Sequence, residues 1–377
     1  MNISTWRNPA ARPAVLVPFC EDLRQSYPGG ACFELLSDPN ATEEACIVGM
    51  FVIRPAFLGD NSDLSMLPSS LFESRAWVHN IVGHDGGGAL SNGSVFDAYR
   101  LALQYGLSDA VLVSSKTVAI EGVRCERLGR EGYVWQPSSV CAWPHVLEFD
   151  AQLRDKIAAQ RRDWQERGYL SPRSCPAQII VTESGRVHEG SNDFLSARIF
   201  SEVQHGTALP LEVLILTSAA GAARIRERVS TIPALASQSA EQIDKLLLVC
   251  SPPTMPEVLD LPRVRALLYR SCGIKVCNHD GGLVSLRNFA AAGALTQLNL
   301  SLGRGLAVRE LPLAASYSDD ELLQKLEYFW GDVMAGHSGA MPRDIEVVAV
   351  HMDAQKDLAV CVIDPRNLKG RDFFNLE

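Results

Sequence analysis

The sequence predicts an α/β fold: a mainly parallel, twisted sheet with helices on both faces and a C-terminal antiparallel hairpin. Two observations lead to this prediction. From residue 177 onward, apolar runs of strand length alternate with segments of helix length, as in parallel sheets whose strands are joined by crossover helices. Near the end of the chain, two apolar runs flank a short polar segment, a pattern typical of a hairpin.

The expected strands are apolar along most of their length, which indicates burial on both faces of the sheet. The parallel strands are expected at residues 77–82, 110–114, 178–182, 211–217, 245–250, 274–277 and 295–302, and the hairpin at 345–352 and 358–363. Helical or looped segments are expected at 221–229 and 259–271, and helices at about 94–105 and 150–167, after Gly282, and at 319–334. The last of these follows Ser318, an N-cap residue type, and begins with acidic residues.

The chain divides into two unequal parts. Residues 1–73 contain proline-rich turns and two apolar runs, 14–19 and 46–53, and are expected to form an N-terminal extension packing on the core. Residues 74–377 are expected to form one domain with an inserted segment at about 125–175. The insertion contains a highly charged amphipathic helix, a pattern typical of a solvated surface.

Composition narrows the classes of function. The 377 residues carry a net charge of −9 without a block rich in Lys or Arg, which argues against a nucleic-acid partner. No apolar run is long enough to cross a bilayer, and the first residues lack the signal-peptide pattern, so we expect a cytoplasmic protein without a membrane partner. The ten cysteines form no Cys-x-x-Cys and the eight histidines are dispersed, so no metal site is expected.

The most informative stretch is residues 274–302. An apolar run ends at Gly281-Gly282, a helix-like run follows, and a second strand-like run closes the unit. Glycines let the backbone approach a ligand closely, and the N–H groups at a helix start can bind an anion. The pattern indicates a phosphate site, although a Gly-Gly pair alone is also typical of a tight turn.

Three segments occur in a characteristic order: residues 75–86, ending in Gly83-His84-Asp85-Gly86; residues 108–122, containing Ser115-Lys116-Thr117-Val118; and His279-Asp280-Gly281-Gly282 with the helix and strand that follow. Together they resemble the reductase domain of bacterial riboflavin biosynthesis and its pyrimidine-reductase relatives. The resemblance covers roughly residues 75–303. It implies a dihydrofolate-reductase-like fold, an NADPH cofactor and a homodimer.

The resemblance also assigns a cofactor site. It implies that Thr117 and the Gly281-Gly282 turn hold NADPH phosphates at two helix N-termini, a role consistent with the unpaired N–H groups there. Lys116 either faces a cofactor phosphate or is a solvated lysine. The full set of expected cofactor-binding residues is Lys116, Thr117, Glu121, Ser184, Gly281, Gly282, Leu283, Val284 and Ser285.

On the substrate side, Asp280 replaces a family glutamate that contacts substrate, and Arg100 is a candidate for binding an anionic group. Arg100 can equally be a surface helix residue. His84 and Asp85 are the candidate catalytic residues, His84 as a proton donor beside the nicotinamide or simply as a turn histidine bonded to backbone. This half of the site departs most from the family pattern, since both acids of Val-Asp-Glu-Leu are lost in Leu295-Thr296-Gln297-Leu298. The departures argue against riboflavin synthesis itself.

The sequence therefore predicts an NADPH-dependent reductase that transfers hydride to a C=O, C=N or C=C bond of a small heterocyclic or polar substrate. The alternative is a non-catalytic cofactor-binding homologue or assembly subunit whose substrate site has decayed. A doubly wound dehydrogenase is disfavoured because no strand leads into Gly-x-Gly-x-x-Gly.

Overall fold

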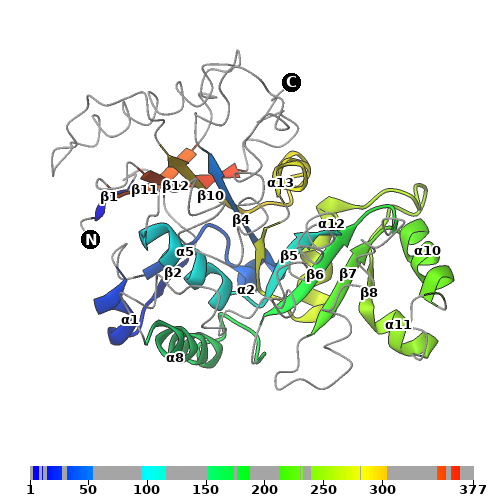
Figure 1. Cartoon of the computed structure of the whole chain (residues 1–377), viewed down its shortest axis with the longest axis horizontal. Helices are drawn as coiled ribbons and strands as arrows, with labels where there is room; N and C mark the ends of the chain where they lie inside the picture. The colour runs from blue at the N-terminus through cyan, green and yellow to red at the C-terminus, as the bar shows by residue number, and fades with distance from the viewer. Residues whose placement is uncertain are drawn as a thin grey trace, which may run out of the picture.

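A computed structural model of the chain (Figure 1) describes residues 3–7, 11, 15–27, 32–53, 95–115, 152–173, 176–186, 212–229, 231, 239–280, 282–303, 346–353 and 358–365. Among these residues, ten strands form one mixed sheet in the order β1-β11-β12-β10-β4-β9-β5-β6-β7-β8. A separate antiparallel pair is formed by β2 (Val15–Pro18) and β3 (Cys32–Leu35).

The sheet is parallel over most of its width. All neighbouring pairs from β10 to β8 are parallel, which confirms the prediction of a mainly parallel sheet. These strands are, in spatial order, β10 (Gln297–Gly303), β4 (Cys46–Ile53), β9 (Val276–His279), β5 (Ala110–Ser114), β6 (Ala177–Thr182), β7 (Val213–Thr217) and β8 (Leu247–Val249).

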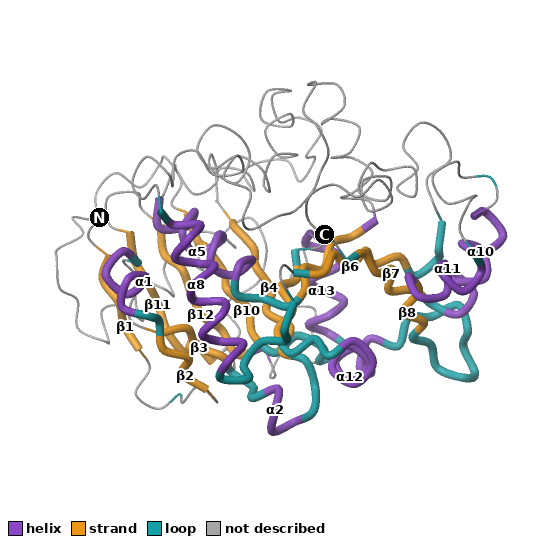
Figure 2. Tube along the Cα trace, turned by 90° about the horizontal axis from the view of Figure 1, so that it is seen from below, coloured by secondary structure: helices purple, strands orange, loops and turns teal. Residues whose placement is uncertain are grey.

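The remaining part of the sheet is antiparallel. Strands β11 (Glu346–Asp353) and β12 (Leu358–Asp364) pair as the expected C-terminal hairpin, β12 also pairs with β10, and β1 (Ile3–Arg7) pairs with β11. Figures 1 and 2 both show β1 at one end of the sheet and β8 at the other. The α/β class and the hairpin are therefore confirmed.

Strand β4 lies inside the sheet, although residues 1–73 were expected only to pack on the core. It pairs with β9 on one side and β10 on the other, and Cys46, Ile47 and Val48 are each at most 1% exposed. The physical reason is the apolar character of this run, which suits a strand buried on both faces. The expected strand at 77–82 lies outside the described residues, as does the expected helix at 319–334.

Helices cover both faces of the sheet. On β5, Val111 and Val113 belong to one apolar cluster and Leu112 to another, because successive side chains of a strand point to opposite faces. The first cluster includes residues of α1 (Glu21–Ser26), α5 (Val95–Gly106), α8 (Leu153–Glu166), α10 (Ala219–Val229) and α11 (Ala240–Leu246). The second includes residues of α12 (Leu261–Cys272) and α13 (Gly282–Ala291). A short helix, α2 (Pro39–Thr42), precedes β4.

The charged helix of the insertion is only partly a solvated surface. Trp164 is fully buried, and Leu153 and Ile157 join the same apolar cluster as α5. Arg161 is 6% exposed and donates hydrogen bonds to the carbonyls of Gly106 and Ser108, at 3.0 and 2.6 Å. Helix α8 is therefore anchored to the chain between α5 and β5.

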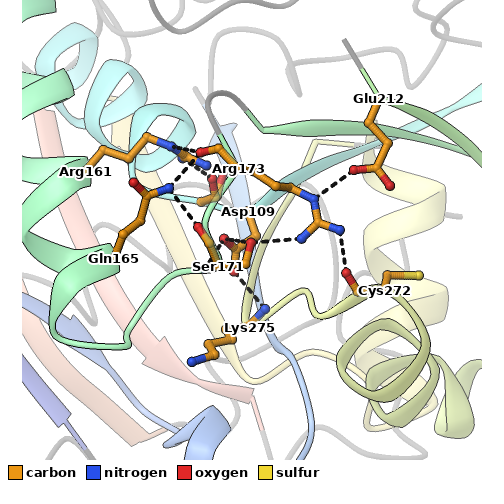
Figure 3. A network of polar contacts seen from close by, with 9 residues as sticks. Asp109, Arg161, Gln165, Ser171, Arg173, Glu212, Cys272 and Lys275 are labelled. Atoms are coloured by element: carbon orange, nitrogen blue, oxygen red, sulfur yellow. Dashed lines mark hydrogen bonds and ion pairs between the residues drawn. The ribbon is translucent and has the colours of Figure 1, made fainter. Parts of the chain in front are cut away.

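Asp109 organises the amino ends of β5 and β9 (Figure 3). One carboxylate oxygen accepts hydrogen bonds from the N–H and the hydroxyl of Ser171, at 2.8 and 2.7 Å. The other accepts from the N–H groups of Lys275 and Val276, at 2.8 and 3.2 Å. Arg173 extends the network to Glu212 and to the carbonyl of Cys272. These bonds fix strand ends opposite the edge at which open α/β sheets place their ligands.

None of the helices in the described part of the chain combines the length and hydropathy needed to cross a membrane.

Candidate functional site

The candidate site lies where the parallel strands β5 and β9 end. Strand β9 ends at His279, Asp280 follows, and α13 begins at Gly282. Strand β5 is paired with β9 and ends at Ser114. The carboxyl ends of parallel strands form the edge at which open α/β sheets bind ligands. The local sequence therefore brings Asp280 and the start of α13 to such an edge.

The side chains at the end of β9 point alternately to two helices. Asn278 accepts a hydrogen bond from Gln104 of α5 at 2.6 Å, and Asp280 accepts one from Tyr105 of the same helix. His279, between them, contacts Ser285 and Phe289 of α13. Asp280 and His279 thus face opposite sides of the sheet and can take separate roles.

Asp280 is held through both its backbone and its side chain. Its N–H donates to the carbonyl of Leu112 at 2.8 Å, which ties it to β5. Its carboxylate accepts a hydrogen bond from the phenol of Tyr105. Tyr105 is fully buried, whereas Asp280 is half-buried. Tyr105 was not among the expected site residues, because its contact with Asp280 depends on how α5 lies against β9.

His279 is fully buried between β9 and α13. Its Nε2 lies 3.0 Å from the Oγ of Ser285, and its ring meets that of Phe289 edge-on, with centroids 4.6 Å apart. Burial lowers the pKa of His279 to about 4, against a smaller opposing effect of the Asp280 carboxylate. The imidazole is therefore neutral near pH 7, with one nitrogen as a donor and the other as an acceptor.

The next two strands bring further groups to the same edge. Ser184 follows β6; its Oγ accepts a hydrogen bond from the N–H of Arg186 at 3.2 Å, and its carbonyl accepts one from Arg224 at 2.5 Å. Gly185, at φ +61°, lies against the start of α10: a Cβ added there would be 2.2 Å from the carbonyl oxygen of Gly221. Both glycines are needed for this close approach of two backbones.

Arg100 is a buried residue and not a surface one. It is 6% exposed, and among the described residues its Nη1 has no hydrogen-bond partner. Its charge acts on Tyr27, Glu34 and His351, which belong to the N-terminal region and to β11. The two residues expected on the substrate side, Arg100 and Asp280, therefore lie over different strands.

Glu34, the acid near Arg100, is paired with a different arginine. Glu34 forms an ion pair with Arg7, and its burial raises the pKa of its carboxyl, an effect that the nearby arginine charges oppose. The neighbouring polar groups are also engaged, since Ser301 donates a hydrogen bond to Asp97 at 2.8 Å and His351 lies 3.1 Å from the hydroxyl of Thr5. This region is a buried polar layer between α5, the N-terminal strands and the C-terminal hairpin.

Several expected site residues lie outside the described residues: His84, Asp85, Lys116, Thr117, Glu121 and Gly281. Gly282, Leu283 and Val284 form the first turn of α13, with Ser285 directly after them. Within the described part of the chain, no group of three or more His, Cys, Asp or Glu side chains is placed to hold a metal ion.

Neither a protein-family model nor a curated protein matches the sequence. Solved structures do match. A pyrimidine reductase-like protein from Corynebacterium diphtheriae has 15% identity and a TM-score of 0.40, over 86% of this chain and 93% of that one. RibD of Acinetobacter baumannii has 10% identity and a TM-score of 0.36, over 86% and 59%. The riboflavin biosynthesis reductase Rib7 of Saccharomyces cerevisiae has 9% identity and a TM-score of 0.35, over 86% and 95%.

Proposed function

We propose that this chain is an NADPH-dependent reductase whose cofactor lies across the carboxyl ends of β5 and β9. It would transfer hydride to a C=O, C=N or C=C bond of a small heterocyclic or polar substrate, and it would act as a homodimer. The observation that carries the proposal is the position of Asp280 and the glycine-led start of α13 at the carboxyl end of β9, beside β5.

The cofactor half of the proposal rests on the first turn of α13. The first N–H groups of a helix have no partner within it, and together with the helix dipole they favour a phosphate. Gly282 adds no side chain that would obstruct such a group. Lys116 and Thr117 would bind a second phosphate, and Glu121 and Ser184 would lie along the rest of the cofactor.

The reacting half of the proposal centres on Asp280. The cofactor would supply the hydride, so the protein need only orient the substrate, exclude water and manage a proton. Asp280, oriented by Tyr105, would accept a hydrogen bond from a ring N–H or hydroxyl of the substrate. His84 and Asp85 stay the candidates for proton transfer. Arg100, on the same helix as Tyr105, stays the candidate for binding an acidic substrate group.

One observation favours the alternative, a cofactor-binding homologue without catalysis. Asp280 already has a protein partner in Tyr105, and a carboxylate used only for that contact would leave the substrate side without its acid. The two proposals differ in turnover and agree on cofactor binding. Oxidation of bound NADPH in the presence of small carbonyl or imine compounds would support the reductase.

Titration followed by nicotinamide fluorescence tests the cofactor. We expect saturable binding of NADPH that is tighter than binding of NADH; equal binding or none would refute the proposal.

Gly282→Val should weaken NADPH binding at least about tenfold, or roughly 1.4 kcal/mol, with little change in melting temperature. Ala291→Val, at the other end of α13, is the matched control and should leave binding unchanged. If Gly282→Val instead melts early, the glycine serves the turn and not the ligand.

A further inference from the structure

We propose that His279 is a positioning residue for the cofactor site. By bridging from the end of β9 to Ser285, it would hold the turn at residues 280–282 and the first turn of α13 in the shape that receives phosphate. The inference rests on the proposed function and adds to it a role for His279, which is not among the expected site residues. Four features of the structure lead to it.

The first feature is the composition of the turn. Asp280 and Gly281 connect β9 to α13, and α13 itself begins with a second glycine, Gly282. Glycine has more backbone freedom to lose than any other residue, so a turn of this composition is not ordered by its own sequence. A phosphate site formed by backbone N–H groups needs those groups held in place before the ligand arrives. Contacts from outside the turn must therefore supply the order.

The second feature is how His279 spans this turn. Its ring nitrogen lies 3.0 Å from the hydroxyl of Ser285, six residues along the chain. Phe289 packs edge-on against the same ring from one helical turn further on. Ser285 and Phe289 are four residues apart and so lie on one face of α13. One buried imidazole thus fixes two successive turns of the helix to the strand.

The third feature is the close approach of α13 to the sheet. Gly49 of β4 is directly opposite His279 in the β4–β9 register. A Cβ at Gly49 would lie 2.5 Å from a methyl carbon of Leu286 and 3.1 Å from one of Leu295. The missing side chain lets Leu286 enter this space, next to the residue that bonds His279. The start of α13 is thereby brought within reach of the imidazole.

The fourth feature is the ionisation of His279. Since burial keeps the ring neutral near pH 7, it offers one donor and one acceptor, and a hydroxyl can pair with either. A side-chain amide offers the same two functions. Glutamine is therefore the conservative replacement at this position.

Three variants of the full-length chain test the inference. Ser285→Ala removes the hydroxyl, and His279→Gln keeps a group able to bond it. Ser301→Ala is the matched control, because the hydroxyl of Ser301, on β10, likewise has a side-chain partner, Asp97 of α5. The two readouts are amide hydrogen exchange of residues 282–289 without ligand, and the dissociation constant of NADPH.

We expect Ser285→Ala to raise exchange at the start of α13 and to weaken NADPH binding about three- to tenfold, the size of one lost hydrogen bond. His279→Gln should fall between wild type and Ser285→Ala on both readouts, and the double variant should cost less than the sum of the two single changes, because both act on the same contact. Ser301→Ala should leave both readouts at the wild-type value.

Failure of the inference is distinct from failure of the proposed function. If wild type binds no NADPH, the proposed function is wrong, and the role of His279 in a cofactor site is wrong with it. If wild type binds NADPH but Ser285→Ala binds it equally well, the proposed function stands and the positioning role is overturned. Unchanged exchange at the start of α13 in Ser285→Ala also overturns it, whatever the affinity.

Discussion

Tyr105 of α5 donates a hydrogen bond from its phenol to the carboxylate of Asp280, directly after β9. The contact joins a fully buried helix residue to a half-buried acid at the carboxyl edge of the sheet. It gives the carboxylate one orientation on the α5 face, opposite the face on which His279 contacts α13. Because successive side chains at the end of β9 point to opposite faces of the sheet, the proposed substrate side and the proposed phosphate side lie on different faces.

Asp280→Asn should keep NADPH affinity within about twofold and lower turnover, because the amide oxygen can still accept from Tyr105 while the charge that would face the substrate is lost. Fluorescence titration and NADPH oxidation measure the two effects separately. Tyr105→Phe, which removes the donor and keeps the carboxylate, should also preserve NADPH binding. A large loss of NADPH affinity in Asp280→Asn would mean that the carboxylate serves the cofactor.

Asp109→Ala should reduce the free energy of unfolding by at least about 3 kcal/mol, because it leaves the N–H groups of Ser171, Lys275 and Val276 without their acceptor. Urea denaturation measures the change. Glu241→Ala is the control: it breaks an exposed ion pair with Lys245 and should change stability by less than about 0.5 kcal/mol. Equal effects of the two variants would show that the network of Figure 3 does not hold the strand ends.

Two glycines with similar backbone angles allow a matched comparison. Gly185 and Gly273 have φ of +61° and +64°, but an added Cβ meets the backbone of Gly221 in the first case and nothing within 4 Å in the second. Gly273→Ala should cost about 1 kcal/mol from backbone strain alone. Gly185→Ala should cost clearly more, by thermal or urea unfolding. Equal losses would mean that the loop after β6 can move away from α10.

Stability should fall with acidification through the two buried histidines. Burial lowers the pKa of His279 to about 4 and that of His351 to about 3, against an ordinary value of 6.5. Between these values the unfolded chain binds protons that the folded chain does not, so the free energy of unfolding decreases as the pH drops below 6.5. Above that pH the contribution is fully present.

The change attributable to His279 is measurable by substitution. The loss of stability between pH 7 and pH 5 should be smaller in His279→Gln than in wild type by about 2 kcal/mol. Comparing the two proteins removes the effect of Glu34, whose raised pKa acts in the opposite direction. Identical pH profiles would show that His279 is not buried in its neutral form.

Most of the parallel strands could be predicted because they coincide with apolar runs, and the hairpin because its strands are neighbours in the chain. The position of β4 could not, although residues 46–48 are as apolar as the rest. Its pairing depends on contacts such as the hydrogen bond from the N–H of Thr296 to the carbonyl of Ile47, about two thirds of the chain away. Local sequence patterns do not predict partners that are so distant in the chain.

In the candidate site, too, features formed by contiguous residues could be predicted and features that depend on distant contacts could not. The glycine turn and Asp280 were visible as a motif, since strand, turn and helix are contiguous there. The contact of Tyr105 with Asp280 and that of His279 with Ser285 could not be predicted, because both depend on how helices lie against β9. The buried position of Arg100 was hidden for a related reason: helical periodicity does not reveal that N-terminal strands and the C-terminal hairpin enclose that end of α5.

A crystal structure of the chain with NADPH is the most direct test of the account. It should place a cofactor phosphate at the N–H groups of the first turn of α13, and the nicotinamide beside the carboxyl ends of β5 and β9, with Asp280 facing the space next to its ring. A cofactor bound elsewhere, or phosphates that do not contact α13, would contradict the account.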